Sequence, residues 1–228
     1  MNIVPQEWDS RFFDLNVGSL VISQSDIFDF DIFKKKSNIF DLIYILSDYK
    51  ITNLALVDEK EVFIKENIEN ISYTFENTVR FSSIKHSYKQ LLHLTLQTGK
   101  YSRFNLDKKF TNNEYNKLYT EWIDKSISKE LAFDIFVKLI DNRIVGFITL
   151  KEITNKIVGV GLVAVDAEYR GYGIAKELTN RAMYEAKLLG YKSIQVVTQH
   201  HNIPAVKLYK AQGFKSKSLT YIYHYWNL

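Results

Sequence analysis

The clearest pattern of apolar and polar positions lies in the second half of the chain. Apolar residues recur at helical spacing across residues 112–128, which predicts an amphipathic helix there. These residues are Tyr115, Leu118, Tyr119, Trp122 and Ile123. Three apolar runs follow, separated by turns that contain asparagine: Ala132–Ile140, Ile144–Ile153 and Ile157–Val165. They predict a three-stranded antiparallel meander.

Two helices and two strands are predicted after the meander. The expected order is a helix over Gly173–Leu189, a strand over Ser193–Thr198, a helix over 202–213 and a strand over Phe214–Tyr225. Gly190 stands where a C′ residue belongs, Asn202 is a candidate N-cap and Pro204 falls in the first turn. The order of elements predicts an α+β domain whose mixed sheet is covered by helices.

The first part of the chain is less regular and predicts short strands with one or two helices. Ile39–Ser47 and Glu61–Lys65 have the composition of strands, and Ile71–Glu76 alternates at period two. The two prolines mark no linker, so the sequence places the domain boundary only within the range of residues 70–90. We expect an N-terminal α/β subdomain over 1–88 and a second domain over 89–228.

Composition narrows the classes of protein to consider. The 228 residues contain no cysteine, which excludes disulfides, thiolate metal ligands and a covalent cysteine mechanism. The N-terminus has acidic residues and a proline where a signal peptide would have a basic start and an apolar run. The longest apolar stretch, Ile157–Val165, is shorter than the ~20 residues of a membrane helix. A soluble cytoplasmic protein with no membrane insertion is therefore expected.

Charge points to a small anionic ligand rather than to nucleic acid. The formal net charge is +4, with 30 basic and 26 acidic residues interspersed. The run Lys34-Lys35-Lys36 is short and typical of a solvated face, whereas nucleic-acid binders concentrate charge on one surface. A mild positive balance suits a phosphorylated cofactor.

The stretch from Val163 to Ala175 carries the most chemical information. An apolar strand runs into a loop with two glycines, Gly171 and Gly173, and this loop opens a predicted helix. Glycines allow backbone N–H groups to approach a ligand, and a helix N-terminus carries partial positive charge, so the two together predict a pyrophosphate cradle. The alternative is a plain strand-to-helix turn in which the glycines serve only backbone geometry.

The spacing Arg170-x-x-Gly173-x-Ala175 resembles the signature of the GNAT superfamily of N-acetyltransferases. Five further positions match the family at fixed offsets: Asn202, Ala205, Tyr209, Gly213 and Phe214. The resemblance covers residues 132–225. It implies the GNAT fold, a mixed, mostly antiparallel twisted sheet flanked by helices, with a smaller N-terminal α/β subdomain. It also implies a co-substrate, acetyl-CoA or another short acyl-CoA, and no metal.

The family resemblance assigns roles to individual positions. Coenzyme A pyrophosphate would lie on the amides of Arg170, Gly171, Tyr172, Gly173, Ile174 and Ala175. The pantetheine arm would pair with the strand at Val163 and Val165, where an amide can also polarise the thioester carbonyl. Asn202 would contact pantetheine or act as a simple N-cap, and Ala205 belongs to the same cofactor-binding set. Lys207 and Lys210 would meet the outer phosphate or remain solvated.

Tyr209 matches the general acid of the family, and its alternative role is packing. A phenol of pKa about 10 can donate to a departing thiolate of pKa about 8.5 when it is positioned. The base that frees the attacking amine stays open. The candidates are His200, His201, Glu121 and Glu152, and an amino sugar is acidic enough that water could take the proton.

The upstream segments 101–110 and 119–126 resemble nucleotide-sugar N-acyltransferases that act on dTDP-linked amino-dideoxyhexoses, among them dTDP-fucosamine acetyltransferases of surface-glycan and O-antigen lipopolysaccharide synthesis. The substrate-binding residues that this likeness implies are Ser102, Arg103, Phe104, Tyr119 and Trp122. On the residues alone, an arginine beside aromatic rings suits a nucleoside diphosphate, whereas Tyr119 and Trp122 on one helical face suit a core.

The expected reaction is direct transfer, in a ternary complex, of an acetyl or short 3-hydroxyacyl group to an amine at C3 or C4 of the sugar. The sugar nucleotide is expected in a cleft between the N-terminal part and the acyltransferase domain. The competing hypotheses are another amine acceptor (a protein N-terminus, a polyamine or an antibiotic) and a non-catalytic acyl-CoA-binding module. A homodimer is possible with either.

Overall fold

The computed structural model of the chain describes residues 2–68, 75 and 77–227, and within these residues contacts group the chain into two compact units. The first unit contains residues 1–61, 199–201 and 218–228. The second contains residues 62–198 and 202–217. These bounds differ from the predicted subdomain over 1–88 and domain over 89–228, because residues 62–88 group with the second unit and the C-terminal segment groups with the first.

The first unit is a small sheet with helices. Its elements are β1 (Val4–Pro5), α1 (Glu7–Phe13), β2 (Val17–Ile22), α2 (Phe30–Ser37), β3 (Leu42–Ser47) and the end of β10 (Lys215–Trp226). The strand order is β1-β2-β3-β10, with β2 parallel and β10 antiparallel to β3. The long return of the C-terminal strand to β3 explains why the chain terminus belongs to this unit. Phe33, Ile43 and Tyr223 are fully buried in its core.

The second unit holds the remaining elements. They are β4 (Leu56–Glu66, whose first residues group with the first unit), β5 (Thr78–Arg80), α3 (Tyr88–Thr98), α4 (Arg103–Leu106), α5 (Glu114–Ile127), β6 (Asp134–Ile140), β7 (Arg143–Thr154), β8 (Ile157–Val165), α6 (Ile174–Leu188), β9 (Ser193–Gln199) and α7 (Ile203–Ala211). Five strands follow the order β9-β8-β7-β6-β5, and only β8 and β9 are parallel among the pairs of this series. The sheet is mixed and mostly antiparallel, as predicted.

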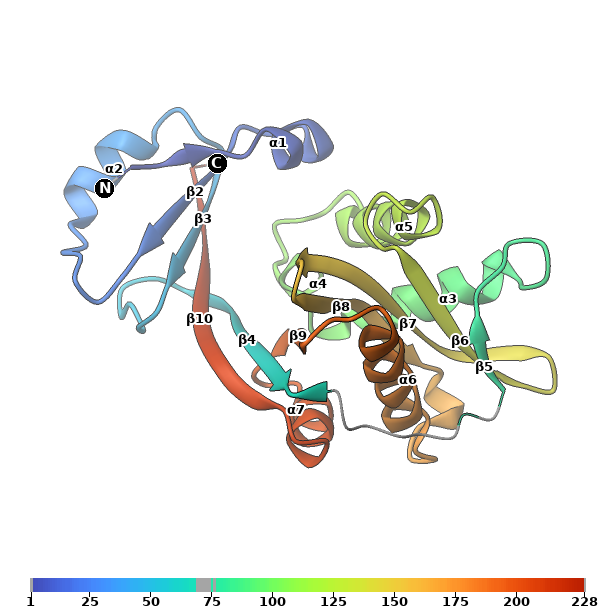
Figure 1. The fold of residues 1–228 in the computed structure, drawn as a ribbon. Coiled ribbons are helices and arrows are strands. Elements are labelled where there is room, and N and C mark those ends of the chain that lie inside the picture. The colour runs from blue at the N-terminus through green and yellow to red at the C-terminus, as the bar shows by residue number, and fades with distance from the viewer. Residues whose placement is uncertain (1, 69–74, 76, 228) are drawn as a thin grey trace. The chain divides into compact units, whose positions relative to one another are not determined.

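Helices cover both faces of these five strands (Figure 1). Alternate residues of β7 explain this, since Phe147 faces a cluster with Leu91 and Leu94 of α3, whereas Ile148 faces a cluster with Leu178 of α6. A strand that is buried on both sides reads as a continuous apolar run, which is what 144–150 shows. The α+β class with flanking helices is therefore confirmed.

Most predicted elements of the second half agree with the structure, and β8 has the predicted bounds. In the first half, the predicted strands at 39–47 and 61–65 correspond to β3 and to part of the longer β4. The strand predicted over 71–76 lies, apart from Phe75, outside the described residues. Within the described part of the chain, no helix has the length and apolar character that crossing a membrane requires.

Candidate functional site

The loop between β8 and α6 has a backbone that requires glycine at two positions. Gly171 has φ +87° and Gly173 has φ +79°, both in the left-handed region. A Cβ placed on either residue would meet nothing within 4 Å, so the glycines serve backbone conformation and not lack of room. The space over the loop is therefore open, and residues 170–173 are exposed to solvent.

Helix α6 begins at this loop with unsatisfied backbone donors. Gly173 is its N-cap and offers no side chain to the first turn. The first backbone N–H to close onto the cap is that of Glu177, at 3.0 Å from the oxygen of Gly173. The N–H groups of Ile174, Ala175 and Lys176 precede it and have no carbonyl in the helix to bind. These donors and the helix dipole favour an anion at the exposed loop.

Strand β8 presents a free backbone edge next to that loop. Its parallel pairing with β9 runs from Ile157↔Ser193 to Val160↔Val196 and ends there, although β8 continues to Val165. Toward β7, the N–H of Leu162 donates to Thr149 Oγ1 at 2.8 Å and that of Asp166 to the carbonyl of Val145 at 2.9 Å.

Because backbone groups alternate along a strand, the N–H groups of the odd-numbered residues Val163 and Val165 point away from β7. They therefore face the side on which β9 has parted from β8. A linear molecule with amide groups can pair with such an edge as an added strand would. The structure thus brings the two valines predicted for pantetheine binding to the unpaired edge.

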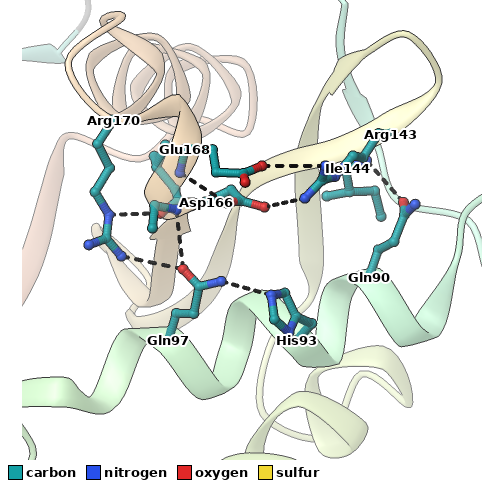
Figure 2. A network of polar contacts seen from close by, with 10 residues as sticks. Gln90, His93, Gln97, Arg143, Ile144, Asp166, Glu168 and Arg170 are labelled. Carbon is teal, nitrogen blue, oxygen red and sulfur yellow. Dashed lines mark hydrogen bonds and ion pairs between the residues drawn. The ribbon is translucent and has the colours of Figure 1, made fainter.

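The side chain of Arg170 turns back from the loop onto this edge. Its Nε donates to the carbonyl of Val165 at 3.1 Å, and its Nη2 donates to Gln97 Oε1 at 3.4 Å (Figure 2). Gln97 Oε1 also accepts from the N–H of Ala167 at 3.3 Å. One carboxamide of α3 therefore holds both the loop backbone and the arginine that the motif singles out.

A second set of contacts fixes the start of the loop (Figure 2). Arg143 Nη2 lies 2.8 Å from Oδ2 of Asp166, a carboxylate that is 4% exposed, and Asp166 Oδ1 accepts from the N–H of Glu168 at 3.1 Å. Gln90 Oε1 accepts from the N–H of Ile144 at 3.0 Å. These residues anchor the turn in which Asp166 caps Ala167–Tyr169.

Sequence reasoning missed helix α3 and its polar residues Gln90 and Gln97. A signal was present, because Ser87 stands three residues before Gln90, which is the spacing of a capping box. In the structure the Ser87 hydroxyl accepts from the N–H of Gln90 at 3.3 Å, as that motif requires. The roles of Gln90 and Gln97 depend on tertiary contacts that a local pattern does not contain.

Helix α7 carries the other matched positions. Asn202 stands at its N-cap, but its side chain does not cap the helix and instead donates from Nδ2 to Thr198 Oγ1 at 3.4 Å. The candidate N-cap hydrogen bond is thus absent. Ala205 is half-buried, and Lys207 and Lys210 are exposed, so both lysines are available to solvent or to a phosphate.

Tyr209 lies inside the second unit, 2% exposed, with its ring 5.9 Å from that of Phe63 and 5.7 Å from that of Phe214. Burial raises the pKa of its phenol above the ordinary value, so the group keeps its proton throughout the neutral range. Packing and the acid role are compatible here, because the ring is enclosed while the hydroxyl has no hydrogen-bond partner among the described residues.

The C-terminal end of α7 is anchored close to Tyr209. Lys65 Nζ donates to the carbonyl of Gln212 at 2.6 Å, and burial lowers the pKa of this lysine. Gln212 Nε2 donates to Asn180 Oδ1 at 2.7 Å and to the carbonyl of Lys176 at 3.1 Å. The helix that carries Tyr209 is therefore fixed to α6, the helix that begins at the glycine loop.

The positions predicted for the sugar nucleotide lie on α4 and α5. Ser102 is buried and caps α4, accepting from the N–H of Phe104 at 3.3 Å. Tyr119 is 7% exposed, and its ring lies 4.8 Å from that of Trp122. Arg103 and Trp122 keep partly exposed side chains. Their roles in substrate binding stay predictions.

The candidate bases have different surroundings. Glu121 is ion-paired with Lys125 at 3.0 Å, and Glu152 accepts from the hydroxyl of Tyr191 at 2.8 Å. His200 Nδ1 lies 2.8 Å from Oε2 of Glu61, a carboxylate that is 4% exposed. No local sequence pattern connects Glu61 with His200, since 139 positions separate them.

Comparison with known proteins identifies the family to which this arrangement belongs. The family model described as "Acetyltransferase (GNAT) family" matches residues 101–214, which include the glycine loop, the unpaired edge of β8 and Tyr209. The chain belongs to the acetyltransferase (GNAT) family. This membership confirms the resemblance that the two separated motifs indicated.

Three curated relatives share part of the length of this chain. Over 55% of its length, the chain is 24% identical to the spore coat polysaccharide biosynthesis protein SpsD of Bacillus subtilis. Over 41% of its length, it is 32% identical to the N-acetylaspartate synthetase of Xenopus tropicalis. Over 46% of its length, it is 30% identical to the human N-acetyltransferase 8B. The aligned parts cover 43%, 35% and 48% of those proteins. The chain thus spans less than half the length of each.

Solved structures agree on the fold. A functionally unknown conserved protein from Staphylococcus epidermidis superposes with TM-score 0.69 over 93% of this chain and 85% of its own, at 13% identity. A putative GNAT acetyltransferase from Novosphingobium aromaticivorans gives TM-score 0.51 over 81% and 73%, at 14% identity. These identities support the fold alone.

Proposed function

We propose that this acetyltransferase family member transfers an acyl group from acyl-coenzyme A to the amine of a dTDP-linked amino-dideoxyhexose. One observation supports the binding of acyl-coenzyme A most directly. Strand β8 parts from β9 after Val160, beside a helix that begins with free amides. The edge fits the amide-bearing pantetheine arm and the loop fits a diphosphate, so one linear ligand satisfies both.

In this proposal, the N–H of Val163 or Val165 polarises the thioester carbonyl as negative charge develops on its oxygen. The amine nitrogen attacks the carbonyl carbon, the carbon–sulfur bond breaks, and Tyr209 gives its proton to the departing thiolate. Burial raises the pKa of Tyr209, so the phenol stays protonated until the sulfur leaves. Arg170 must leave the carbonyl of Val165 before pantetheine can pair there.

The sugar acceptor is supported by one relative and by the partly exposed Arg103 and Trp122. SpsD of Bacillus subtilis is named for spore coat polysaccharide biosynthesis, and it aligns with 55% of this chain. Acetyl and short 3-hydroxyacyl donors, and amines at C3 or C4, all belong to the proposal. A cytoplasmic location and a role in surface-glycan synthesis follow from such a substrate.

A second acceptor class has a specific observation in its favour. The N-acetylaspartate synthetase of Xenopus tropicalis is 32% identical over 94 residues, a higher identity than that of SpsD over a shorter segment. An amino-acid amine is therefore the main alternative to the sugar amine. Both alternatives share the same donor and the same attack on the thioester.

The test is a thiol-release assay with acetyl-CoA and 3-hydroxybutanoyl-CoA as donors. The acceptors are dTDP-4-amino-4,6-dideoxygalactose, a dTDP-3-amino-3,6-dideoxyhexose, the same amino sugars without dTDP, and L-aspartate. Turnover of a dTDP-amino sugar at least about tenfold above the free amino sugar is the expected result, since nucleotide binding should contribute to kcat/KM. Turnover of aspartate alone would favour the second class.

A further inference from the structure

The carboxamide of Gln97 has a fixed orientation beside the glycine loop (Figure 2). Its nitrogen Nε2 lies 3.0 Å from Nε2 of His93, one helical turn earlier on α3. A carboxamide nitrogen only donates hydrogen bonds, so this contact turns Oε1 toward the N–H of Ala167 (3.3 Å) and Nη2 of Arg170 (3.4 Å). All four residues belong to the second unit, so the arrangement lies within one compact body.

The guanidinium of Arg170 is held by neutral acceptors. Its Nε donates to the carbonyl of Val165 at 3.1 Å and its Nη2 to the Gln97 carboxamide, and no carboxylate among the described residues pairs with it. The positive charge is therefore not neutralised, in contrast to that of three other arginines of the same unit. These are Arg80, paired with Asp134, Arg143, paired with Asp166, and Arg181, paired with Glu185.

The Val165 carbonyl belongs to the backbone edge that a pantetheine arm would use. In an extended strand the C=O and N–H of one residue point to the same side, so this carbonyl faces away from β7, as the N–H of Val165 does. The pairing of β8 with β9 ends at Val160, and farther along this edge the Arg170 guanidinium lies on the carbonyl. The guanidinium and a strand-like ligand therefore compete for the same edge.

An anion at the glycine loop acts on this arginine. The first N–H groups of α6, which begins at Ile174, favour an anion there. Arg170 stands four residues before Ile174, a span of at most about 14 Å along the chain. A diphosphate at those amides attracts the guanidinium, because charged phosphate oxygens bind it more strongly than neutral carbonyls do. The anion therefore favours the position of Arg170 that leaves Val165 free.

We propose that Arg170 is a specificity residue that makes binding of the pantetheine arm depend on the diphosphate, and that Gln97 is its positioning residue. The inference rests on the acyl-coenzyme A part of the proposed function and not on the acceptor. Diphosphate and pantetheine both favour the released guanidinium, so each increases the affinity for the other. A pantetheine thioester without a nucleotide must displace the guanidinium unaided. The protein thereby selects acyl-coenzyme A over shorter pantetheine thioesters.

The experiment divides the donor into two probes that bind at different places. ADP supplies a diphosphate to the loop, and S-acetyl-pantetheine supplies the arm to the edge of β8. Calorimetry measures the Kd of S-acetyl-pantetheine with and without saturating ADP. In the wild type, ADP is expected to lower this Kd at least about fivefold, the lower end of typical couplings between two sites. S-acetyl-pantetheine should lower the Kd of ADP by the same factor, because such coupling is reciprocal.

Arg170→Ala should change the two affinities in opposite directions. Without ADP, the Kd of S-acetyl-pantetheine should fall to that of the ADP-saturated wild type, because the edge is open, and ADP should then change it less than about twofold. The Kd of ADP alone should rise, since a cation is lost. Lys176→Ala is the matched control, because it removes an exposed positive charge from the first turn of α6. It should weaken ADP binding without tightening that of S-acetyl-pantetheine.

Two substitutions of Gln97 separate the positioning role from damage to the fold. Gln97→Ala removes the acceptor that holds Nη2 of Arg170, so the guanidinium leaves the edge more readily and S-acetyl-pantetheine should bind more tightly than to the wild type. Gln97→Glu places a carboxylate beside the guanidinium and holds it more strongly, so S-acetyl-pantetheine should bind more weakly. Structural damage would move both variants in the same direction.

Each result supports or overturns the inference. Unchanged S-acetyl-pantetheine affinity in Arg170→Ala overturns it, and so does ADP coupling of equal size in this variant and in the wild type. If circular dichroism shows that Arg170→Ala does not fold, the Gln97 variants decide, since opposite shifts support the inference and shifts in one direction overturn it. A wild type that binds acetyl-CoA without coupling between the two probes overturns the inference while the proposed function stands. A wild type that binds no acetyl-CoA overturns both.

Discussion

At the scale of single residues, burial and backbone conformation decide which motif positions can act. Tyr209 is enclosed by Phe63 and Phe214 and keeps its proton because burial raises the pKa of its phenol. Gly173 holds a backbone angle of +79° with open space beyond it. One residue is therefore suited to donate a proton, and the other leaves room for a ligand. The two roles predict different kinetic consequences on substitution.

Tyr209→Phe should lower kcat about 10²-fold with little change in the Kd of acetyl-CoA, because the phenol proton is given only as the thioester breaks. Steady-state kinetics with calorimetry of acetyl-CoA binding measures both quantities. The substitution removes one oxygen from a packed ring, so the fold should be kept. Wild-type turnover in this variant would contradict the acid role.

Gly173→Asp should abolish measurable acetyl-CoA binding, because it places bulk and negative charge where the diphosphate would lie. Gly173→Asn is the matched control, since asparagine has nearly the same shape, no charge, and tolerates a positive φ. Calorimetry should give an affinity for Gly173→Asn between those of the wild type and Gly173→Asp. Equal affinities in all three proteins would exclude the loop as the diphosphate site.

At the scale of elements, two tyrosines join α3 to α5 and thereby hold the polar face of α3 against the loop. The Tyr88 hydroxyl donates to Asp124 Oδ1 at 2.8 Å, and the Tyr115 hydroxyl donates to the carbonyl of Leu96. Gly99 has no room for a side chain because the Tyr115 ring lies against it. Gln97 follows Leu96 directly, so the α3–α5 contact also fixes the carboxamide that holds Arg170.

The same tyrosines predict a loss of stability in alkali. Burial, with smaller effects of Asp124 on Tyr88 and of Tyr119 on Tyr115, raises the pKa of each phenol from 10.0 to about 12. The folded state therefore binds more protons than the unfolded state above pH 10, so the stabilisation is complete below pH 10 and is lost as pH rises toward 12. Urea unfolding at several pH values measures this slope.

Tyr115→Phe tests that assignment. The variant should be less stable at pH 7 by about 1 kcal/mol, since it loses a hydrogen bond, and its stability should fall less steeply between pH 10 and pH 12. An alkaline slope equal to that of the wild type would show that Tyr115 does not contribute. Tyr221→Phe, which changes a tyrosine of the first unit, is the matched control for removal of a phenol.

At the scale of the whole molecule, the sequence predicted the second half well because its signals are local. The meander, the glycine loop and the caps of α6 follow from periodicity and turn chemistry at adjacent positions. The compact units were not predictable in this way, since β10 returns to β3 across the length of the chain. The Glu61–His200 and Gln97–Arg170 contacts were not predictable for the same reason, because each joins residues that are far apart in the sequence.

Acetyl-CoA should leave a specific footprint on this architecture. In hydrogen–deuterium exchange, the amides of Val163, Val165 and residues 170–176 are expected to become protected, since their N–H groups would bind the ligand. Strand β2 of the first unit should exchange as before. The free energy of unfolding should increase with ligand concentration, by about 2.7 kcal/mol at 100 times Kd, and the Tm should rise with it. Protection confined to other segments would contradict the proposed binding edge.

The hydrogen bond from Arg170 to the carbonyl of Val165 has a consequence for the protein before any cofactor arrives. A strand with unpaired amides invites a strand of a neighbouring molecule, which is a route to aggregation. A guanidinium on that edge opposes such intermolecular pairing with a charge, as lysines on the edge strands of other sheets do. Removal of this arginine should therefore reduce shelf life at high concentration, even in samples in which each molecule remains correctly folded.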